Sequence, residues 1–115
     1  MKLREKQSLF TVLIADLIQH ARALGYDLTF GEAYRPPETA ALYAKQRKGI
    51  AASLHTLRLA VDFNLFKDGH YLTSTEAHRP LGEYWELQSG DDYECCWGGR
   101  FRDGGHYSIA HGRRK

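Results

Sequence analysis

The first strong pattern in the chain is a run of apolar residues at spacings of three and four over residues 8–24, which predicts an α-helix with one buried face. Its apolar positions are Leu9, Leu13, Ile14, Leu17, Ile18, Ala21 and Leu24. Gly25 follows and predicts the C-terminal cap of this helix. Apolar and polar residues then alternate over residues 26–30, which predicts a strand.

A second helix is predicted to begin at Pro36-Pro37-Glu38 and to end near Gln46, because proline and an acidic residue favour a first helical turn and alanines follow. Residues 47–52 lack periodicity, which predicts a loop. Apolar and polar residues alternate again over residues 57–66, and the predicted strand has Asp62 in its middle. A carboxylate in so apolar a strand needs a charged or hydrogen-bonding partner, because desolvating it alone is costly.

The rest of the chain predicts a hairpin, a helix and a last strand. Lys67-Asp68-Gly69-His70 contains the Asp-Gly pair of a tight turn, and a return strand begins at residues 71–72. A capped helix can begin at residues 73–76, although Pro80 predicts that it is broken or starts late. Residues 106–109 are predicted to form the last short strand. No internal repeat and no linker divides these elements, so we expect one domain over residues 1–115.

The composition indicates a folded protein and argues against a membrane span. Of the 115 residues, 43% are apolar and 12% are aromatic, which is enough to build a core without disulfides. The longest apolar run, within residues 9–18, is interrupted by Thr11 and Asp16 and falls short of the ~20 apolar residues that span a bilayer. No cleavage site of a signal peptide follows it. We therefore expect synthesis in the cytoplasm and no insertion into the membrane.

Charge and cysteine content add little to this picture. The net charge is +2, and three of the 16 Lys and Arg lie in the last five residues, 111–115. Such a tail can touch an anionic polymer, but a solvated chain end is the simpler interpretation, and we expect no nucleic-acid partner. Cys95 and Cys96 are adjacent, so a disulfide between them would be strained, and they lack the C-x-x-C spacing of a zinc ribbon. We expect two reduced thiols packed near Trp97.

Two histidines and a mid-strand aspartate form a candidate metal site. Zinc accepts histidine nitrogen and carboxylate oxygen, and a catalytic site uses three protein ligands and keeps a fourth position for water. His55, Asp62 and His106 meet this requirement if the chain bends after His55 and if His106 lies on a neighbouring strand. Spacing by itself leaves an alternative, in which both histidines are ordinary surface residues and Asp62 pairs with Arg58 or Arg35.

Asp103 and Arg35 are the candidates for the reaction itself. Asp103 lies three residues before His106, and the glycines at 104 and 105 would let the backbone turn tightly, so that both side chains enter one cleft. A carboxylate placed there can take a proton from water and deliver it to a leaving amine. Arg35 is predicted at a strand-to-helix junction, where it either pairs with a neighbouring carboxylate or recognises a substrate carboxylate or carbonyl.

Three blocks of the sequence resemble one known family. Ser53-x-His55-x-x-x-x-Ala60-x-Asp62 resembles the S-x-H-x-x-G-x-A-x-D signature of the zinc D-alanyl-D-alanine carboxypeptidase and L-alanyl-D-glutamate peptidase family, which includes VanY-type enzymes and many phage endolysins. Asp103-x-x-His106 after Trp97-Gly98-Gly99 resembles the second motif of that family. Tyr34-Arg35-Pro36-Pro37-Glu38 with Leu42-Tyr43-Ala44 resembles its first block.

This resemblance implies an α+β fold of the Hedgehog/DD-peptidase-like type, in which a small antiparallel β-sheet is flanked by helices. The elements predicted above agree with that fold. The resemblance also implies that His55, Asp62 and His106 bind one catalytic Zn²⁺ ion and that Asp103 is the general base and acid.

Supporting roles follow from the same resemblance. Arg35 would polarise the scissile carbonyl or hold a substrate carboxylate, and Ser53 would support the site by hydrogen bonding. Arg58 is a departure, because the signature usually has glycine at this position. The arginine either alters the bend after His55 or puts a positive charge at the rim of the cleft.

The activity implied is hydrolysis of peptidoglycan. We expect a monomeric phage or prophage endolysin that cuts the L-alanyl-D-glutamate bond of the stem peptide for bacterial cell lysis, acts on the cell wall, and depends on a holin for access to it. The alternative activity is that of a D-alanyl-D-alanine carboxypeptidase. An alternative from another class is a cell-wall or zinc-binding module without catalysis, although the presence of Asp103 argues against it.

Overall fold

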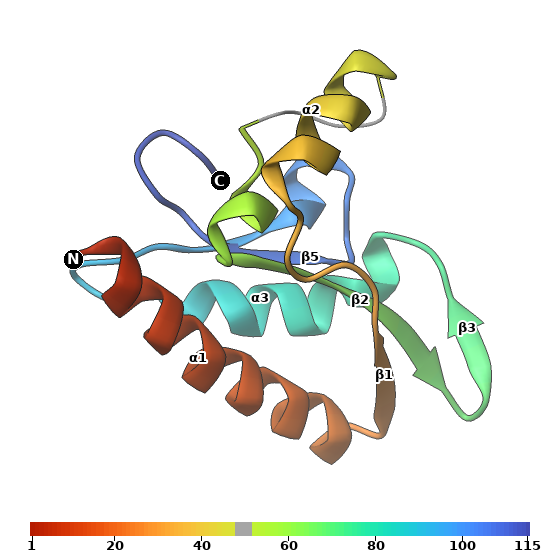
Figure 1. The fold of residues 1–115 in the computed structure, drawn as a ribbon. Coiled ribbons are helices and arrows are strands. Elements are labelled where there is room, and N and C mark those ends of the chain that lie inside the picture. Colours follow the sequence, from red (N-terminus) through yellow and green to blue (C-terminus); the bar gives the residue numbers. More distant parts are fainter. Residues whose placement is uncertain (48–51) are drawn as a thin grey trace.

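The computed structural model of the protein describes residues 1–47 and 52–115, which form helices and strands joined by short turns (Figure 1). The helices are α1 (Leu3–Ala23), α2 (Pro37–Lys45) and α3 (Arg79–Leu87). The strands are β1 (Tyr26–Phe30), β2 (Ala60–Lys67), β3 (His70–Leu72), β4 (Cys95–Trp97) and β5 (His106–Ile109). Three 3-10 turns, η1 (Leu54–Leu57), η2 (Glu76–His78) and η3 (Gly98–Phe101), connect them.

All of these strands belong to one antiparallel sheet. The order along the sheet is β1-β2-β5-β4, and β3 pairs with the far end of β2. The predicted α+β architecture, an antiparallel sheet with flanking helices, is therefore confirmed. Because β2 pairs with β1 on one side and with β5 on the other, segments from both ends of the chain meet along it.

The two faces of β2 differ as the alternation of its residues predicts. Val61, Phe63 and Leu65 are buried in the core, whereas Asp62 and Asn64 are only partly buried and project from the opposite face. Tyr107 lies opposite Val61 and His106 lies opposite Asp62 in the register between β2 and β5. The sheet therefore presents a polar cross-strand pair on the face away from the core.

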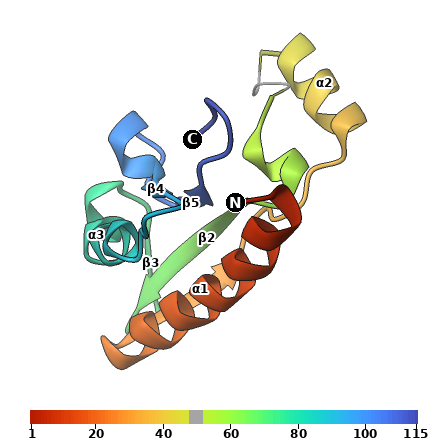
Figure 2. The same ribbon diagram turned by 90° about the vertical axis from the view of Figure 1, so that its left-hand side faces the viewer.

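Helices α1 and α3 cover the apolar side of the sheet and contact each other, whereas α2 lies apart from both of them (Figures 1 and 2). Leu17 of α1 and Trp85 of α3 are fully buried there, together with Tyr107 of β5. The indole nitrogen of Trp85 donates to the carbonyl oxygens of Cys96 and Ser108, at 3.1 and 3.0 Å. This pair of bonds ties α3 to β4 and β5, and it satisfies a donor that would be costly to bury alone.

Several boundaries differ from those predicted. Helix α1 begins at Leu3 instead of residue 8, because the Glu5 carboxylate accepts a hydrogen bond from the Lys2 amide at 2.9 Å and caps the first turn. Strand β2 begins at Ala60 instead of residue 57, because the preceding residues form η1. Helix α3 starts late, at Arg79, as Pro80 in its first turn predicts. Most of the loop predicted over residues 47–52 lies outside the described residues.

Two further features bear on the expectations from composition. Among the described residues, no helix is both long enough and apolar enough to cross a membrane. Cys95 and Cys96 are buried free thiols next to Trp97 in β4. Burial raises the pKa of Cys95 to about 12 and that of Cys96 to about 11, so both thiols are protonated at neutral pH.

Candidate metal centre

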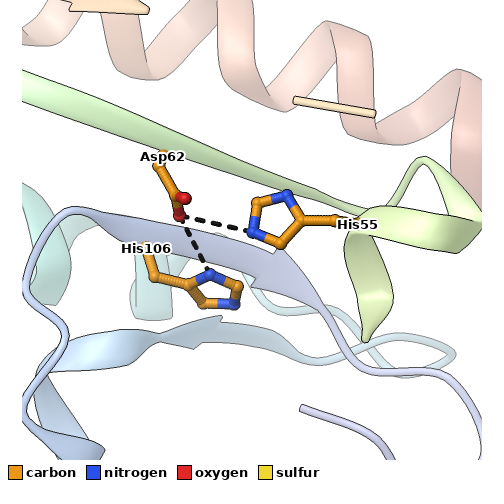
Figure 3. Close-up of side chains that lie close together, drawn as sticks. All are labelled: His55, Asp62 and His106. Carbon is orange, nitrogen blue, oxygen red and sulfur yellow. Dashed lines mark hydrogen bonds and ion pairs between the residues drawn. The ribbon is translucent and has the colours of Figure 1, made fainter. Parts of the chain in front are cut away.

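Asp62 and His106 meet because β2 and β5 pair in antiparallel register. The two residues lie directly opposite each other, so their side chains project from the same face of the sheet. His106 Nδ1 lies 3.2 Å from Asp62 Oδ1 (Figure 3). The His106 residue is only 8% exposed, and the ring of Phe101 lies in a T-shaped contact with its ring at 5.7 Å.

His55 reaches the same carboxylate from η1. The hydroxyl of Ser53 accepts a hydrogen bond from the His55 amide at 3.1 Å and caps this short turn. The chain then reverses at Arg58, whose backbone is left-handed (φ 58°, ψ 34°), and enters β2. His55 Nε2 lies 3.4 Å from Asp62 Oδ1, so the bend predicted after His55 brings the two side chains together (Figure 3).

The hydrogen bonds of His55 indicate that a cation suits this site. His55 Nδ1 lies 2.8 Å from the carbonyl oxygen of Ala33, which can only accept, so Nδ1 carries the ring proton. In the neutral ring the lone pair of Nε2 then faces a carboxylate oxygen, which is repulsive unless a proton or a metal ion lies between them. The carbonyl thus fixes the tautomer that metal-binding histidines use.

The distances and the donor types fit one metal ion. One ligand atom each from His55, Asp62 and His106 can be chosen so that all three lie within 4.8 Å of one another. Two imidazole nitrogens and one carboxylate oxygen are a ligand set that zinc accepts, with a fourth position left for water or substrate. The structure therefore brings together the three residues that the sequence singled out as ligands.

The charges of the three side chains are strongly coupled. Burial raises the pKa of Asp62, but hydrogen bonds from His106 and His55 outweigh this effect and hold its pKa at about 2. Burial lowers the pKa of His55, but the hydrogen bonds to Asp62 and to the Ala33 carbonyl outweigh it, and the net shift is upward. Asp62 is therefore a carboxylate throughout the physiological pH range and attracts positive charge to this point.

The alternative arrangement of these residues is wrong. His55 is 3% exposed, so neither histidine of the cluster is an ordinary surface residue. Asp62 interacts with the two histidines, whereas Arg35 pairs with Glu32 and Arg58 stacks over the ring of Tyr34. The guanidinium carbon of Arg58 lies 3.9 Å from the centre of that ring.

Asp103 begins the turn that leads into His106. Its amide donates to the Gly98 carbonyl at 2.9 Å, and its own carbonyl accepts from the His106 amide at 3.1 Å. Gly98 permits this approach, since a Cβ there would lie 2.2 Å from the Asp103 carbonyl oxygen. The glycines at 104 and 105 are predicted to let the backbone turn tightly, but neither has a positive φ, and Gly104 supplies space instead: a Cβ there would lie 2.6 Å from Thr75 Cα.

Asp103 shares a cavity with one candidate metal ligand, Asp62. A cavity of about 260 Å³ is lined by Asp62, Asp103 and His78, together with polar residues of the segment 73–75. Asp103 is exposed as a whole, but partial burial of its carboxyl group, reinforced by the nearby charge of Asp62, raises its pKa. The turn thus places a carboxyl group with a perturbed pKa in the cavity that contains one of the candidate ligands.

Arg35 has the carboxylate partner that the sequence left as one of two alternatives. Its Nε donates to Glu32 Oε1 at 2.8 Å, and its Nη2 also donates to this oxygen. The guanidinium lies 5.2 Å from the ring centre of Tyr43, and the Arg35 amide donates to the His55 carbonyl at 3.1 Å. The junction before α2 is therefore tied directly to η1.

Sequence reasoning missed two residues beside the centre. Glu32 pairs with Arg35 and has Oε1 3.9 Å from His55 Nδ1, and its position three residues before Arg35 could have suggested the pairing. His78 lines the cavity with its Nδ1 3.1 Å from the Tyr107 hydroxyl oxygen. No spacing rule connects residues 78 and 107, so only the fold reveals this contact.

Comparison with known proteins provides a likeness in fold. No protein-family model matches the chain. No curated protein matches it either. Among solved structures, the chain is similar to a mutant of the vancomycin resistance D,D-pentapeptidase VanY from a VanB-type resistance cassette, in complex with Zn(II). The TM-score is 0.55 at 21% sequence identity, over 89% of this chain and 71% of that one. This protein therefore has the fold of that zinc-bound peptidase.

Proposed function

We propose that this protein is a zinc-dependent peptidase that hydrolyses the stem peptide of peptidoglycan. The observation that carries this proposal is the convergence of His55 Nε2, Asp62 Oδ1 and His106 Nδ1 beside a cavity that also holds the Asp103 carboxyl. The shared fold with a zinc-bound D,D-pentapeptidase and the three motifs resembling its family support the same conclusion.

In the proposed site, His55, Asp62 and His106 hold one Zn²⁺ ion. When bound there, zinc supplies a Lewis acid for the scissile carbonyl and makes water nucleophilic near neutral pH. The Ala33 carbonyl keeps the His55 proton on Nδ1, so that Nε2 remains available as a ligand.

Asp103 carries the proton transfers. Its carboxylate accepts a proton from the attacking water, whose oxygen forms the new bond to the carbonyl carbon. As the C–N bond breaks, the same carboxyl returns the proton to the leaving nitrogen, so that the products are an amine and a carboxylic acid, which then ionises. A raised pKa suits this exchange, because the group must release the proton as readily as it takes it.

Arg35 and Ser53 complete the site. Arg35 directs Nε and Nη2 to Glu32, and we assign its remaining nitrogen, Nη1, to a substrate oxygen. Ser53 caps η1 through the His55 amide and so holds the backbone of a ligand in place.

For the biological role, we favour a monomeric endolysin that cuts the L-alanyl-D-glutamate bond and reaches the wall with help from a holin. The support for it is the motif resemblance to a family that contains many phage endolysins. A D-alanyl-D-alanine carboxypeptidase is the second candidate, favoured by the similar structure, which is a D,D-pentapeptidase. The two activities differ in whether Arg35 meets an internal carbonyl or a free carboxylate. A binding module without catalysis has no use for the Asp103 carboxyl in this cavity.

The test is zinc analysis of the purified protein, followed by mass spectrometry of fragments released from purified peptidoglycan. A new N-terminal D-glutamate identifies the endopeptidase, whereas free D-alanine identifies the carboxypeptidase. Asp103→Ala should lower the hydrolysis rate by ~100-fold or more with zinc still near one per chain, because only the proton carrier is lost. Asp92→Ala, an exposed loop variant, is the matched control. Full activity of Asp103→Ala removes the base assignment, and wild-type protein that releases no fragment contradicts the proposed function.

A further inference from the structure

His78 is a buried imidazole that none of the roles above uses. It is 5% exposed, ends η2 and directly precedes α3. The Ser74 hydroxyl accepts the Ala77 amide at 3.1 Å and fixes this turn, and Pro80 starts the helix that follows. The ring nevertheless lines the cavity that contains Asp62 and Asp103. A polar ring in such a place is either part of the core or part of the site.

The contact with Tyr107 determines which nitrogen of His78 carries the proton. Tyr107 is fully buried, and its hydroxyl lies 3.1 Å from His78 Nδ1, its one side-chain partner within the described residues. A buried phenol that did not donate would leave an unsatisfied O–H, which costs ~1 to 3 kcal/mol. The hydroxyl therefore donates to Nδ1, and the ring proton lies on Nε2. Burial lowers the pKa of His78, so the ring is neutral at neutral pH.

The Nε2 edge of the ring points toward the turn that carries Asp103. A Cβ built on Gly105 would lie 3.8 Å from His78 Nε2 and 3.7 Å from its Cε1. Within residues 1–47 and 52–115, no hydrogen bond satisfies Nε2, and yet no fully enclosed side-chain nitrogen or oxygen lacks a partner. Nε2 is therefore reached from the cavity, and its N–H is a fixed donor directed into the hollow.

The charges around this donor indicate what it binds. Asp62 and Asp103 place two carboxyl groups in the cavity against one cation, Arg102, so the excess of acidic groups disfavours a substrate carboxylate there. The rest of the wall is mostly neutral and polar, with Asn64, Ser74 and Thr75 among its residues. A neutral acceptor, such as the carbonyl oxygen of a peptide group, suits this surface.

We propose that His78 is a substrate-binding residue whose Nε2–H donates to a peptide carbonyl oxygen of the stem peptide. Tyr107 is the positioning residue that fixes the tautomer of His78. This inference rests on the proposed function and extends it. The carbonyl belongs to a peptide group next to the scissile bond, because the donor and Asp103 line one cavity of about 260 Å³. His78 thus contributes to substrate affinity and not to metal binding.

The first test compares KM, kcat, zinc content and melting temperature of the zinc-loaded protein with those of its variants, on a synthetic stem peptide. His78→Phe keeps a ring but removes the donor, and we expect KM to rise about three- to tenfold, the effect of one neutral hydrogen bond, with zinc content unchanged. His78→Gln keeps an N–H donor and should recover part of the loss. His70→Gln, in the exposed hairpin, is the matched control. A His78→Phe protein with lower melting temperature and unaltered KM overturns the inference.

The second test does not depend on the His78 variants folding. In zinc-loaded Asp103→Ala protein, ¹⁵N NMR of the histidine rings should show the Nε2–H tautomer for His78, and saturating stem peptide should shift that Nε2–H signal but not the signals of His70. A His78 signal that does not respond to peptide overturns the inference even if the wild-type protein cleaves peptidoglycan. If the signal shifts but the wild-type protein cleaves nothing, the proposed function alone is refuted, and His78 is supported as a peptide-binding donor.

Discussion

Asp62 and His106 lie opposite each other on two paired strands, whereas His55 reaches the same point from a 3-10 turn. The first pair is fixed by the hydrogen-bond register of β2 and β5, which cannot shift by one residue without turning Val61 and Tyr107 out of the core. His55 depends instead on separate contacts, with the Ser53 hydroxyl and the Ala33 carbonyl. The strand half of the centre is therefore rigid by architecture, and the turn half is rigid by local hydrogen bonds.

Removal of a ligand from the strand half should have the largest effect. His106→Ala leaves the sheet register intact but deletes one of the three proposed zinc ligands. Substitution of a residue that only supports a ligand typically lowers metal affinity by up to ~100-fold. Loss of a ligand itself should lower zinc affinity by more than this, and the rate of hydrolysis should fall with it. Competitive titration with a chelator measures the affinity. Undiminished zinc content in His106→Ala would show that the third ligand is another residue.

Acid should weaken the strand half in the metal-free protein. The pKa of Asp62 is about 2 in the folded state, against 3.8 ordinarily. Because the folded-state pKa is the lower one, the carboxylate adds stability above pH ~4 that is lost as the pH falls toward ~2. Urea titrations across this interval should show a decline in the free energy of unfolding that Asp62→Asn makes shallower. The same pH dependence in both proteins would mean that the histidines do not stabilise the carboxylate.

In the turn half, Ser53→Ala should have a moderate effect. It removes the acceptor of the His55 amide and should lower the free energy of unfolding by about 1 kcal/mol, the usual cost of losing such a cap. Zinc affinity should also weaken, since η1 carries a ligand. Ser74→Ala is the control, because it removes the acceptor of the Ala77 amide in η2 and leaves the candidate metal ligands untouched. If Ser74→Ala weakens zinc binding as much as Ser53→Ala does, the two halves are not held independently.

The smallest effect is expected at Arg58, also in the turn half. Its left-handed backbone (φ 58°) costs roughly 1 kcal/mol in any residue with a side chain, while stacking over Tyr34 returns about 0.5 to 1 kcal/mol. Arg58→Gly should therefore leave stability almost unchanged. Arg58→Ala loses the stacking and keeps the strain, so it should be about 1 kcal/mol less stable than the glycine variant. Equal stabilities in urea titrations would contradict this account.

Arg58 also departs from the sequence signature, and yet the chain turns at this position. The signature has glycine where a left-handed turn is needed between His55 and Asp62. Arg58 adopts that turn nevertheless, and its guanidinium lies on Tyr34. The chain therefore bends after His55, as the candidate metal site requires, although the residue at the bend is an arginine.

The sequence by itself determined the elements and the candidate ligands, because periodicity, turn residues and motif spacing are local properties of the chain. It placed Asp62 on the face of β2 away from the core, and its motifs singled out His55, His106 and Asp103. The turn from Asp103 to His106 lies where the sequence predicts it, but the reason for its glycine differs. Gly104 leaves room for the backbone of Thr75 and does not adopt a special backbone angle.

Only the tertiary structure decided which partners these residues have. The Ala33 carbonyl that orients His55 and the Tyr107 hydroxyl that holds His78 are contacts that no motif encodes, whereas the Glu32 carboxylate that holds Arg35 lies only three residues before it. The contacts of His55 and His78 join residues more than twenty positions apart, and all three depend on how the strands, turns and helices pack. A side chain of given chemistry acquires its tautomer, its charge and its direction from such neighbours, and these properties determine what the site can bind.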